Sequence, residues 1–421
     1  MTGPRMRTAA LLVALFLGVA PAATGAPAVA PADPVDLGGT PVEDVSTDPQ
    51  HPAPLTAGLW SDVVGPRQQH EFSYERTDGM PFSTVHIGVV GTSQNDGSDQ
   101  LEITAETPDG TSCGSDSSSP SYLFPDAPFG AEITLQGTEQ GDLNGPCLRA
   151  KVINFSVGRG LSDVDTDLPV AIKIVEEAAL EDPSEQLPAA PEEEPPYDVP
   201  RPGTPDDTTG ADSFEDAPLL DSGTYADTGD EGEVKLYRVS LDWGQTLAVR
   251  MDVPTMEPAL AEQTSGFGPD FELTLFNPMR NTLDTHPEAD ASAALDGDEA
   301  QRVGDAAGPV RYLSRYGGSA TYLPGDYWIA VAVEPSSGEE EPISFPYELT
   351  VEVQGEAEGA PAYDRNEPFL VGEDSFSTVA SGNPAPQDDE AASDTRRLAA
   401  LGLGLFGLAC CGLGTLRLRR R

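Results

Sequence analysis

The sequence is poor in basic residues, in histidine and in cysteine. Its 421 residues include 23 Lys and Arg against 71 Asp and Glu, with four His and four Cys. Affinity for nucleic acid comes mainly from Lys and Arg that neutralise phosphates, so the net charge of -48 excludes nucleic-acid partners. It also disfavours close approach to an anionic membrane surface. Because only 38% of the residues are hydrophobic, against 43 Gly and 40 Pro, we do not expect one packed core over the whole length.

The few basic residues are concentrated at the two ends of the chain. Two of them precede every acid and six follow the last acid: Arg5, Arg7, Arg396, Arg397, Arg417, Arg419, Arg420 and Arg421. The segment from Asp33 to Asp394 therefore holds 15 bases and all 71 acids, a net charge of -56. The chain has an extremely acidic middle between two basic ends.

The N-terminal end has the pattern of a secretory signal. Arg5 and Arg7 precede an apolar run from Ala9 to Ala20, and an Ala-Pro-Ala cleavage site follows at residues 20–22. A run of this length is too short to span a bilayer, which disfavours an uncleaved anchor. We expect a signal peptide over residues 1–30, removed between Ala23 and Pro31, and a flexible segment over residues 31–50.

The C-terminal end has the pattern of a membrane anchor. Residues 398–416 are uncharged and apolar, and at about 1.5 Å per residue they would cross roughly 28 Å of hydrocarbon. The basic tail at 417–421 places the C-terminus in the cytoplasm and the preceding domains outside the cell. No Leu-Pro-x-Thr-Gly sorting motif precedes the span, so we expect it to be retained. Cys410 and Cys411 lie within it, and their acylation is left open.

Cys113 and Cys147 are the only cysteines of the exported part. They lie 34 positions apart in one candidate domain, and two cysteines in an oxidising compartment most simply form a disulfide. Metal binding at this pair would require further Cys or His residues nearby, and the sequence has none there.

An internal repeat organises the middle of the chain. At an offset of 165, residues 55–62 match residues 220–227, and the same offset pairs Phe72 with Tyr237, Gly79 with Gly244 and Phe82 with Leu247. The offset then lengthens to 170, where residues 101–108 meet residues 271–278, and to 177, where residues 169–174 meet residues 346–351. Ordered matches with a growing offset indicate two copies of one domain, the second with longer loops.

Both copies are predicted to consist of β-strands. In the second, apolar and polar or small residues alternate over residues 234–241, 247–253, 271–276, 327–333 and 347–353, with Gly, Pro, Asp and Asn between them. No apolar pattern with a period of 3.6 is long enough for crossover helices. The fold class we expect is all-β: two tandem antiparallel β-sandwich domains with a jelly-roll-like arrangement, plus one C-terminal transmembrane helix.

The second copy resembles a known bacterial family. The stretches Asp212–Ala217, Gly223–Tyr225, Tyr237–Val239, Gly244–Leu247, Phe271–Phe276, Pro324–Val331 and Tyr347–Val351 are similar to the bacterial pre-peptidase C-terminal (PPC) domain. That resemblance implies a small β-sandwich that accompanies secreted proteases and surface proteins, with structural rather than catalytic motifs. The long polar insert from Asn281 to Gly308 departs from a compact copy, and no peptidase accompanies the domain in this chain.

The repeat and the composition together set the expected domain boundaries. The first sandwich should cover residues 51–177, and the second, PPC-like one residues 209–355. Residues 178–208 are acidic and rich in Pro, so we expect an extended linker that buries nothing. Residues 356–397 have a similar character and are predicted to form a stalk, with a short docking spot at Phe369-Leu370-Val371.

No combination of residues points to catalysis. The sequence Gly110-Thr111-Ser112-Cys113-Gly114 has the spacing of a nucleophile elbow. However, it follows a turn, and its own domain has no downstream Asp or Glu that is followed by a His. The four histidines at 51, 70, 86 and 286 are scattered, and two of them without a third ligand are expected at the surface. We therefore predict that the protein is not an enzyme and has no cofactor.

Two weaker features indicate binding. Asp163, Asp165 and Asp167 alternate as in a calcium loop, although Leu168 and Ile174 occupy the positions where an EF-hand needs Gly and Glu. Trp60 and Tyr225 recur at equivalent positions and Trp328 lies on a predicted strand, so these aromatics are candidates for a binding face. Recurrence in both copies also fits a shared position in the core, which is the interpretation we favour for Trp60 and Tyr225.

These features predict a non-enzymatic cell-surface protein in the membrane through residues 398–416. Its partner would be an unknown surface protein or a cell-wall component. Two alternatives stay open: a carbohydrate-binding protein that uses its aromatics, and a calcium-dependent adhesion module.

Overall fold

A computed structural model describes residues 34–93, 99–160, 164–191, 195–197, 199–264, 268–283, 292–294, 300–335 and 342–372. Within these ranges the chain forms 20 strands, two short α-helices and one 3-10 helix, which confirms an all-β sandwich. The signal peptide predicted over residues 1–30 and the span predicted over 398–416 lie outside these ranges. No helix of the described part is long and apolar enough to cross a membrane.

The first sandwich consists of a six-stranded and a five-stranded sheet around one apolar core. One sheet has the order β1 (Thr40–Pro41), β3 (Gly58–Val64), β10 (Leu168–Glu177), β5 (Thr84–Thr92) and β8 (Pro128–Leu135), and its sixth strand, β20 (Phe369–Leu370), pairs with the end of β10 outside this order. The other has the order β2 (Ala53–Leu55), β4 (Gln69–Glu75), β9 (Val152–Gly158), β6 (Leu101–Glu106) and β7 (Ser112–Ser118). The core contains Phe72, Phe155, Ile87 and Ile172, one from each of β4, β9, β5 and β10.

The second sandwich repeats this plan. One sheet has the order β11 (Asp206–Asp207), β12 (Gly223–Asp230), β19 (Ser344–Gln354), β14 (Thr246–Val253) and β17 (Gln301–Ala307). The other has the order β13 (Val234–Leu241), β18 (Gly325–Val333), β15 (Asp270–Phe276) and β16 (Ser292–Ala294). Tyr327, Ile329, Val331 and Val333 share the inner face of β18, as their alternation predicts.

The strand register shows the repeat residue by residue. Ile172 on β10 pairs with Trp60 on β3, and Leu349 on β19 pairs with Tyr225 on β12, in agreement with the offsets of 165 and 177. One sequence match is displaced: Phe82 lies in the turn before β5 with a φ of 60°. The pairings of β5 and β14 place Val85 at the position of Leu247 instead, because the first copy has three more residues in this turn.

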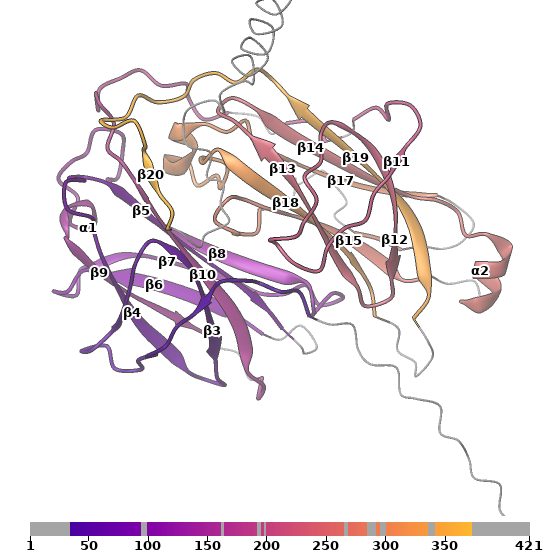
Figure 1. Cartoon of the computed structure of the whole chain (residues 1–421), viewed down its shortest axis with the longest axis horizontal. Helices are drawn as coiled ribbons and strands as arrows, with labels where there is room; N and C mark the ends of the chain where they lie inside the picture. Colours follow the sequence, from indigo (N-terminus) through magenta and orange to yellow (C-terminus); the bar gives the residue numbers. More distant parts are fainter. Residues whose placement is uncertain are drawn as a thin grey trace, which may run out of the picture.

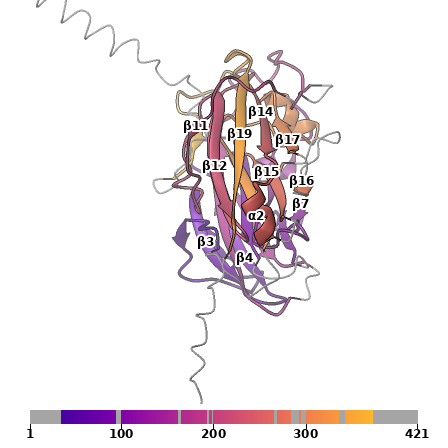
Figure 2. The same cartoon turned by 90° about the vertical axis from the view of Figure 1, so that its right-hand side faces the viewer.

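The two sandwiches lie side by side and their neighbouring sheets are packed face to face (Figure 1; Figure 2). The outer faces of β3, β5 and β10 meet those of β13, β15 and β18 in a separate apolar cluster. Every residue of β5 and of β18 is consequently buried, which requires contact on both faces of these strands. The described part of the chain is thus a stack of four sheets with three apolar layers between them.

Short elements complete the fold. α1 (Pro146–Arg149) carries Cys147, α2 (Pro258–Gln263) follows β14, and the 3-10 helix η1 (Tyr312–Tyr316) follows β17. The pairings β1–β3, β2–β4 and β11–β12 are parallel, so the sheets are antiparallel except at these two- or three-residue edges.

The segments expected as linker and stalk are packed against the sandwiches where the structure describes them. Leu180 and Val199 are buried, and the Arg250 guanidinium donates to the carbonyl of Val199. Further along, β20 (Phe369–Leu370) pairs with the end of β10, so the predicted docking spot at 369–371 does contact the first sandwich. The few apolar side chains of these acidic segments supply the burial that their average composition does not indicate.

Candidate functional site

Several buried charged groups lie at the junction between the two sandwiches, beside an apolar layer. Its apolar part includes Trp328, Phe214 and Phe276, with ring centroids 5.5 Å apart for Phe214 and Trp328 and 5.6 Å apart for Phe214 and Phe276. Val90 and Ala171 of the first copy lie in the same cluster. Burying this layer holds the two copies in contact through the hydrophobic effect.

Two glycines allow the backbones of the two copies to approach closely. A Cβ atom on Gly88 would lie 2.1 Å from the carbonyl oxygen of Met279, and one on Gly130 would lie 2.0 Å from that of Arg280. Gly88 is on β5 and Gly130 is on β8, so the loop after β15 lies directly on the face of the first sandwich. Any side chain at either position would separate the copies.

Two buried cations cross the junction. Lys173 Nζ donates to the carbonyl oxygen of Pro278 at 2.6 Å, and the Arg280 guanidinium donates to that of Leu37. Burial lowers the pKa of Lys173 to about 7 and that of Arg280 to about 10. Arg280 also lies 4.5 Å above the ring of Phe214, a cation–π contact.

Glu177 is the centre of a second polar cluster. The Arg315 guanidinium donates to both of its carboxylate oxygens, at 2.6 and 3.1 Å, and His86 Nε2 lies 2.9 Å from Oε2. Tyr363 donates its hydroxyl to Oε1 at 2.6 Å. Burial opposes ionisation of this carboxyl, but the positive charge of Arg315 and the bond to His86 outweigh it and lower its pKa to about 2. Burial conversely lowers the pKa of His86.

Glu132 is the centre of a third cluster, on β8. Its carboxylate accepts from the Tyr322 hydroxyl and, at 2.7 Å, from Asn277 Nδ2. Burial raises the pKa of Glu132 to about 7. Asn277 Nδ2 also donates to the Ala320 carbonyl at 3.1 Å, and Asn277 Oδ1 accepts from the Asn281 backbone at 3.0 Å. The Glu132–Asn277 pair therefore ties β8 to two loops of the second sandwich.

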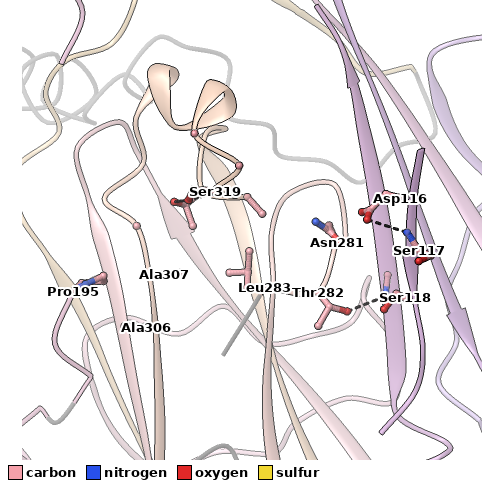
Figure 3. Close-up of a pocket in the computed structure, with 16 residues that line it drawn as sticks. Asp116, Ser117, Ser118, Pro195, Asn281, Thr282, Leu283, Ala306, Ala307 and Ser319 are labelled. Carbon is pink, nitrogen blue, oxygen red and sulfur yellow. Dashed lines mark hydrogen bonds between the residues drawn. The ribbon is translucent and has the colours of Figure 1, made fainter. Parts of the chain in front are cut away.

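A cleft of about 530 Å³ opens beside this pair, between the two copies. Its walls are formed by β7 and β8 of the first sandwich, and by residues 281–283, the end of β17 and residues 317–321 of the second, with Pro195 at the edge. Figure 3 shows Asp116, Ser117 and Ser118 on one side, Asn281 and Thr282 next to them, and Ser319 farther across. The size lies within the usual range for small-molecule sites, about 300–1,000 Å³.

Asp116 joins the edges of two sheets at the cleft. Its Oδ1 accepts from the backbone N–H of Ser117 on β7, and its Oδ2 accepts from that of Glu132 on β8, each at 2.9 Å. Thr282 Oγ1 caps β8 in the same way by accepting from Gly130 at 2.9 Å. These side chains accept hydrogen bonds from edge N–H groups that would otherwise be free to pair with another strand.

The structure places the predicted aromatic candidates away from a shared binding face. Trp328 is 2% exposed and donates its Nε1 to the Phe214 carbonyl at 3.0 Å, so it cannot stack on a ligand from solvent. The prediction failed because the outer face of β18 is covered by the other copy. Trp60 and Tyr225 are half-buried against their own cores and make equivalent 2.9 Å bonds, to the carbonyls of Thr56 and Asp221.

The disulfide between Cys113 and Cys147 is present and links β7 to α1, with Cα atoms 5.5 Å apart. Ser112, which has the spacing of an elbow nucleophile, begins β7 and is exposed. It therefore lies on a strand after a turn instead of on a strand-to-helix turn.

The acidic loop offers no cation site in its described part. Asp165 and Asp167 are exposed, Asp163 lies outside the described residues, and no group of three His, Cys, Asp or Glu side chains that could hold a metal occurs among residues the structure describes. The loop is held instead by Arg159, which donates to the Thr166 carbonyl and forms an ion pair of 2.5 Å with Asp99.

Two histidines expected at the surface are buried instead. His70 Nδ1 lies 2.6 Å from Asp62 Oδ2, and the equivalent residues of the second copy, Lys235 and Asp227, form an ion pair of 3.2 Å. The offset of 165 relates His70 to Lys235 and Asp62 to Asp227. A comparison of the charged residues of the two copies would therefore have predicted the His70–Asp62 contact. The contacts of His86 reach residues about 50 to 240 positions away, and no local pattern indicates them.

Comparisons with known proteins give no family for this chain. No family model matches it, and no curated protein matches it. Solved structures resemble it only weakly. The N-terminal tandem CBM22 domain of Xyn10C from Paenibacillus barcinonensis is 11% identical with a TM-score of 0.17, covering 71% of this chain and 92% of its own. A structure of infectious bursal disease virus is 10% identical with a TM-score of 0.22, covering 79% and 77%. These TM-scores carry no conclusion about function.

Proposed function

We propose that this is a non-enzymatic cell-surface protein whose two sandwiches act as one rigid unit and receive a protein or envelope component in the cleft between them. The observation that carries the proposal is the cleft itself, which exists only because residues of both copies are held in contact. Clefts at domain junctions are frequent ligand sites. The buried pairs at Glu177 and Glu132 explain why its walls would keep their shape without a ligand.

The proposed location is the cell membrane, with a single span over residues 398–416, the tail at 417–421 in the cytoplasm and both sandwiches outside. The basic ends, the apolar runs and the disulfide support it. We also propose that residues 209–355 are a PPC-like accessory module with a jelly-roll-like arrangement. The Gly-Asp-Tyr motif at 325–327 begins β18, which is consistent with a structural role.

Protease treatment of intact cells that express the full chain tests the location. We expect the sandwiches to be degraded from outside while a C-terminal epitope remains protected and resists extraction by alkaline carbonate. A chain that is released by carbonate, or protected until the cells are lysed, contradicts the proposal.

Sedimentation with isolated envelope fragments of the producing cells tests the cleft. We expect the full-length chain, purified in detergent, to co-sediment, and Ser117→Trp to abolish this because Ser117 lines the cleft. Ser115→Trp is the matched control, since Ser115 is exposed on the same strand, two residues away, and does not line the cleft. Lack of retention, or equal retention of both variants, counts against the cleft. Hydrolysis of envelope polymers by wild type that Ser112→Ala abolishes counts against a non-enzymatic role.

A further inference from the structure

The chemistry of the cleft walls identifies a class of ligand. We propose that the cleft binds an uncharged oligosaccharide segment, which it recognises through hydroxyl, amide and peptide groups. This inference rests on the proposed function, because it assumes that the cleft is the contact site. It differs from recognition by exposed aromatics, for which Trp328 is too deeply buried.

The walls, where the structure describes them, offer no positive charge for an anionic ligand. None of the described residues that line the cleft is Lys, Arg or His, so phosphate or carboxylate groups would enter without a cationic partner, in a chain of net charge -48. Burial of an unpaired charge is costly. Asp116 is the one acidic residue among the described residues of the lining, and each of its oxygens already accepts a backbone hydrogen bond. Within the described part of the lining, a cationic ligand would therefore have to share the Asp116 oxygens with these two N–H groups.

The walls instead offer neutral hydrogen-bonding groups. Within the described ranges, the hydroxyls of Ser117 and Ser118 and the side-chain amide of Asn281 have no protein partner. Thr282 keeps a free donor, since its oxygen accepts from Gly130. Hydroxyls and amides provide both donors and acceptors, as sugar hydroxyls require. A ligand without such groups would leave these side chains unpaired.

Glycines at the rim leave room for a ligand near the backbone. A Cβ atom on Gly318 would meet nothing within 4 Å, and one on Gly317 would meet only the Ser314 carbonyl, at 3.5 Å. This differs from Gly130, whose Cβ position is filled by the protein itself. The peptide groups at 317–318 are therefore open to a polar ligand on the side of the cleft away from β7.

The position of the walls is set by Asn277. It donates to Glu132 on β8 and to Ala320 in one wall, and accepts from Asn281 in another. The positions of three walls, from two sandwiches, thus depend on the side-chain amide of Asn277. Because these walls are held in place before a ligand enters, little conformational entropy is lost on binding. Asn277 is a positioning residue and does not itself line the cleft.

An extended peptide is the competing occupant, because β7 is the edge strand of its sheet. Strand addition needs free N–H groups along the edge. At the cleft, however, the N–H of Ser117 is already taken by Asp116. The same residue takes the N–H of Glu132 on β8, so neither edge offers a ladder there. The geometry favours a ligand that contacts side chains and loop backbone over one that extends a sheet.

Titration calorimetry of the full-length chain with matched trisaccharides tests the inference. The neutral probes are N-acetylchitotriose, cellotriose, maltotriose and mannotriose, and the charged ones are the chitosan trimer and trigalacturonate. We expect at least one neutral trimer to bind and trigalacturonate not to bind. If N-acetylchitotriose is a neutral trimer that binds, it should bind more tightly than the charged chitosan trimer. Ser117→Trp should weaken binding by about tenfold or more, while Ser115→Trp stays within about twofold of wild type.

Asn277→Asp provides a readout specific to positioning. The new carboxylate faces Glu132 and lacks the Nδ2 group that donates to Glu132 and to the Ala320 carbonyl. The affinity for the trimer should therefore fall at pH 8. Two carboxyls in contact share a proton at lower pH, which restores a donor. We expect affinity to recover at pH 5 in this variant, beyond any change seen in wild type at the same two pH values.

The outcomes separate this inference from the proposed function. Failure of every neutral trimer, or equally tight binding of the charged ones, overturns the inference; if Ser117→Trp still abolishes envelope retention, the proposed function stands. If a peptide but none of the trimers competes with the envelope fragments for the chain, the occupant of the cleft is a peptide and the inference is overturned. Loss of both envelope retention and trimer binding in wild type overturns both.

Discussion

Tyr363 donates a hydrogen bond of 2.6 Å to Glu177, which joins the segment after the second sandwich to the last residue of β10 in the first. The surrounding backbone makes further bonds, from Ala178 to Pro368 at 2.7 Å and from Asp364 to Ala179 at 3.0 Å. Arg315 and His86 hold the same carboxylate from the two sandwiches. A segment that composition describes as a stalk is therefore part of the junction.

Replacing Tyr363 by Phe should loosen this segment. The change removes a hydrogen bond to a charged group, typically about 1.5–3 kcal/mol, and keeps the ring that contacts Phe369. We expect faster hydrogen exchange over residues 362–370 and a lower denaturation midpoint. Tyr122→Phe, at a side chain that is 79% exposed, is the control and should change neither. Equal exchange in wild type and Tyr363→Phe would show that the backbone bonds alone dock the segment.

Removing Arg315 should be far more damaging than removing an exposed cation. Arg315→Met leaves Glu177 charged and buried without its main partner, which typically costs about 3–5 kcal/mol. Lys151→Met breaks pairs with Glu75 and Asp78, whose side chains are exposed, and should change stability far less because solvent screens these pairs. Urea denaturation of both variants measures the difference. Similar losses in the two would mean that the buried pair is not a main support of the junction.

Glu132→Gln should change how stability depends on pH. Burial raises the pKa of Glu132 from 4.5 to about 7, so the folded state binds this proton more tightly than the unfolded state. Its contribution is fully present below about pH 4.5 and is lost as pH rises to about 7. Relative to wild type, the variant should therefore gain stability across this window, by on the order of 3 kcal/mol.

Urea denaturation of wild type and Glu132→Gln at several pH values from 4.5 to 7.5 measures this difference. Glu102→Gln, on the exposed face of β6, gives the baseline for changing a carboxyl to an amide. A difference between Glu132→Gln and wild type that stays constant with pH would mean that Glu132 is not held in a buried environment.

Loss of the disulfide should loosen most strongly the two elements that it joins, β7 and α1. The bond closes a loop across 34 positions, for which the loss of unfolded-state entropy contributes about 3–4 kcal/mol. We expect the variant with Cys113→Ser and Cys147→Ser to show increased hydrogen exchange in β7 and α1, with β15 and β18 less affected. Exchange in β7 and α1 that stays at the wild-type rate would contradict this expectation.

The alternation of apolar and polar residues predicts the strands well because it reports burial against the strand's own sandwich. The five strands expected in the second copy correspond to β13, β14, β15, β18 and β19, with ends displaced by three residues or fewer. The repeat predicts the common strand plan for a related reason: equivalent turns and inner faces carry similar residues, as Gly58 and Gly223 do at the start of β3 and β12.

The junction and its cleft could not be predicted in the same way. His86, Lys173 and Trp328 lie on faces that alternation assigns to solvent, and they are buried only because the other copy covers them. Lys173 finds its partner 105 positions away at Pro278, and Glu177 finds Arg315 138 positions away. Such pairs leave no periodic signal. The calcium candidates rest on local spacing and the aromatic candidates on the repeat and on a predicted strand, and none of these reports this packing.

The central claim is that the two sandwiches form one unit, and calorimetric unfolding of the full-length chain tests it most directly. The account predicts one cooperative transition for the described part in wild type. Gly88→Val, whose Cβ would collide with the Met279 carbonyl, should split it into two, while Gly317→Val, at an open position, should not. Two separate transitions in wild type, or a single unchanged transition in Gly88→Val, would contradict the account.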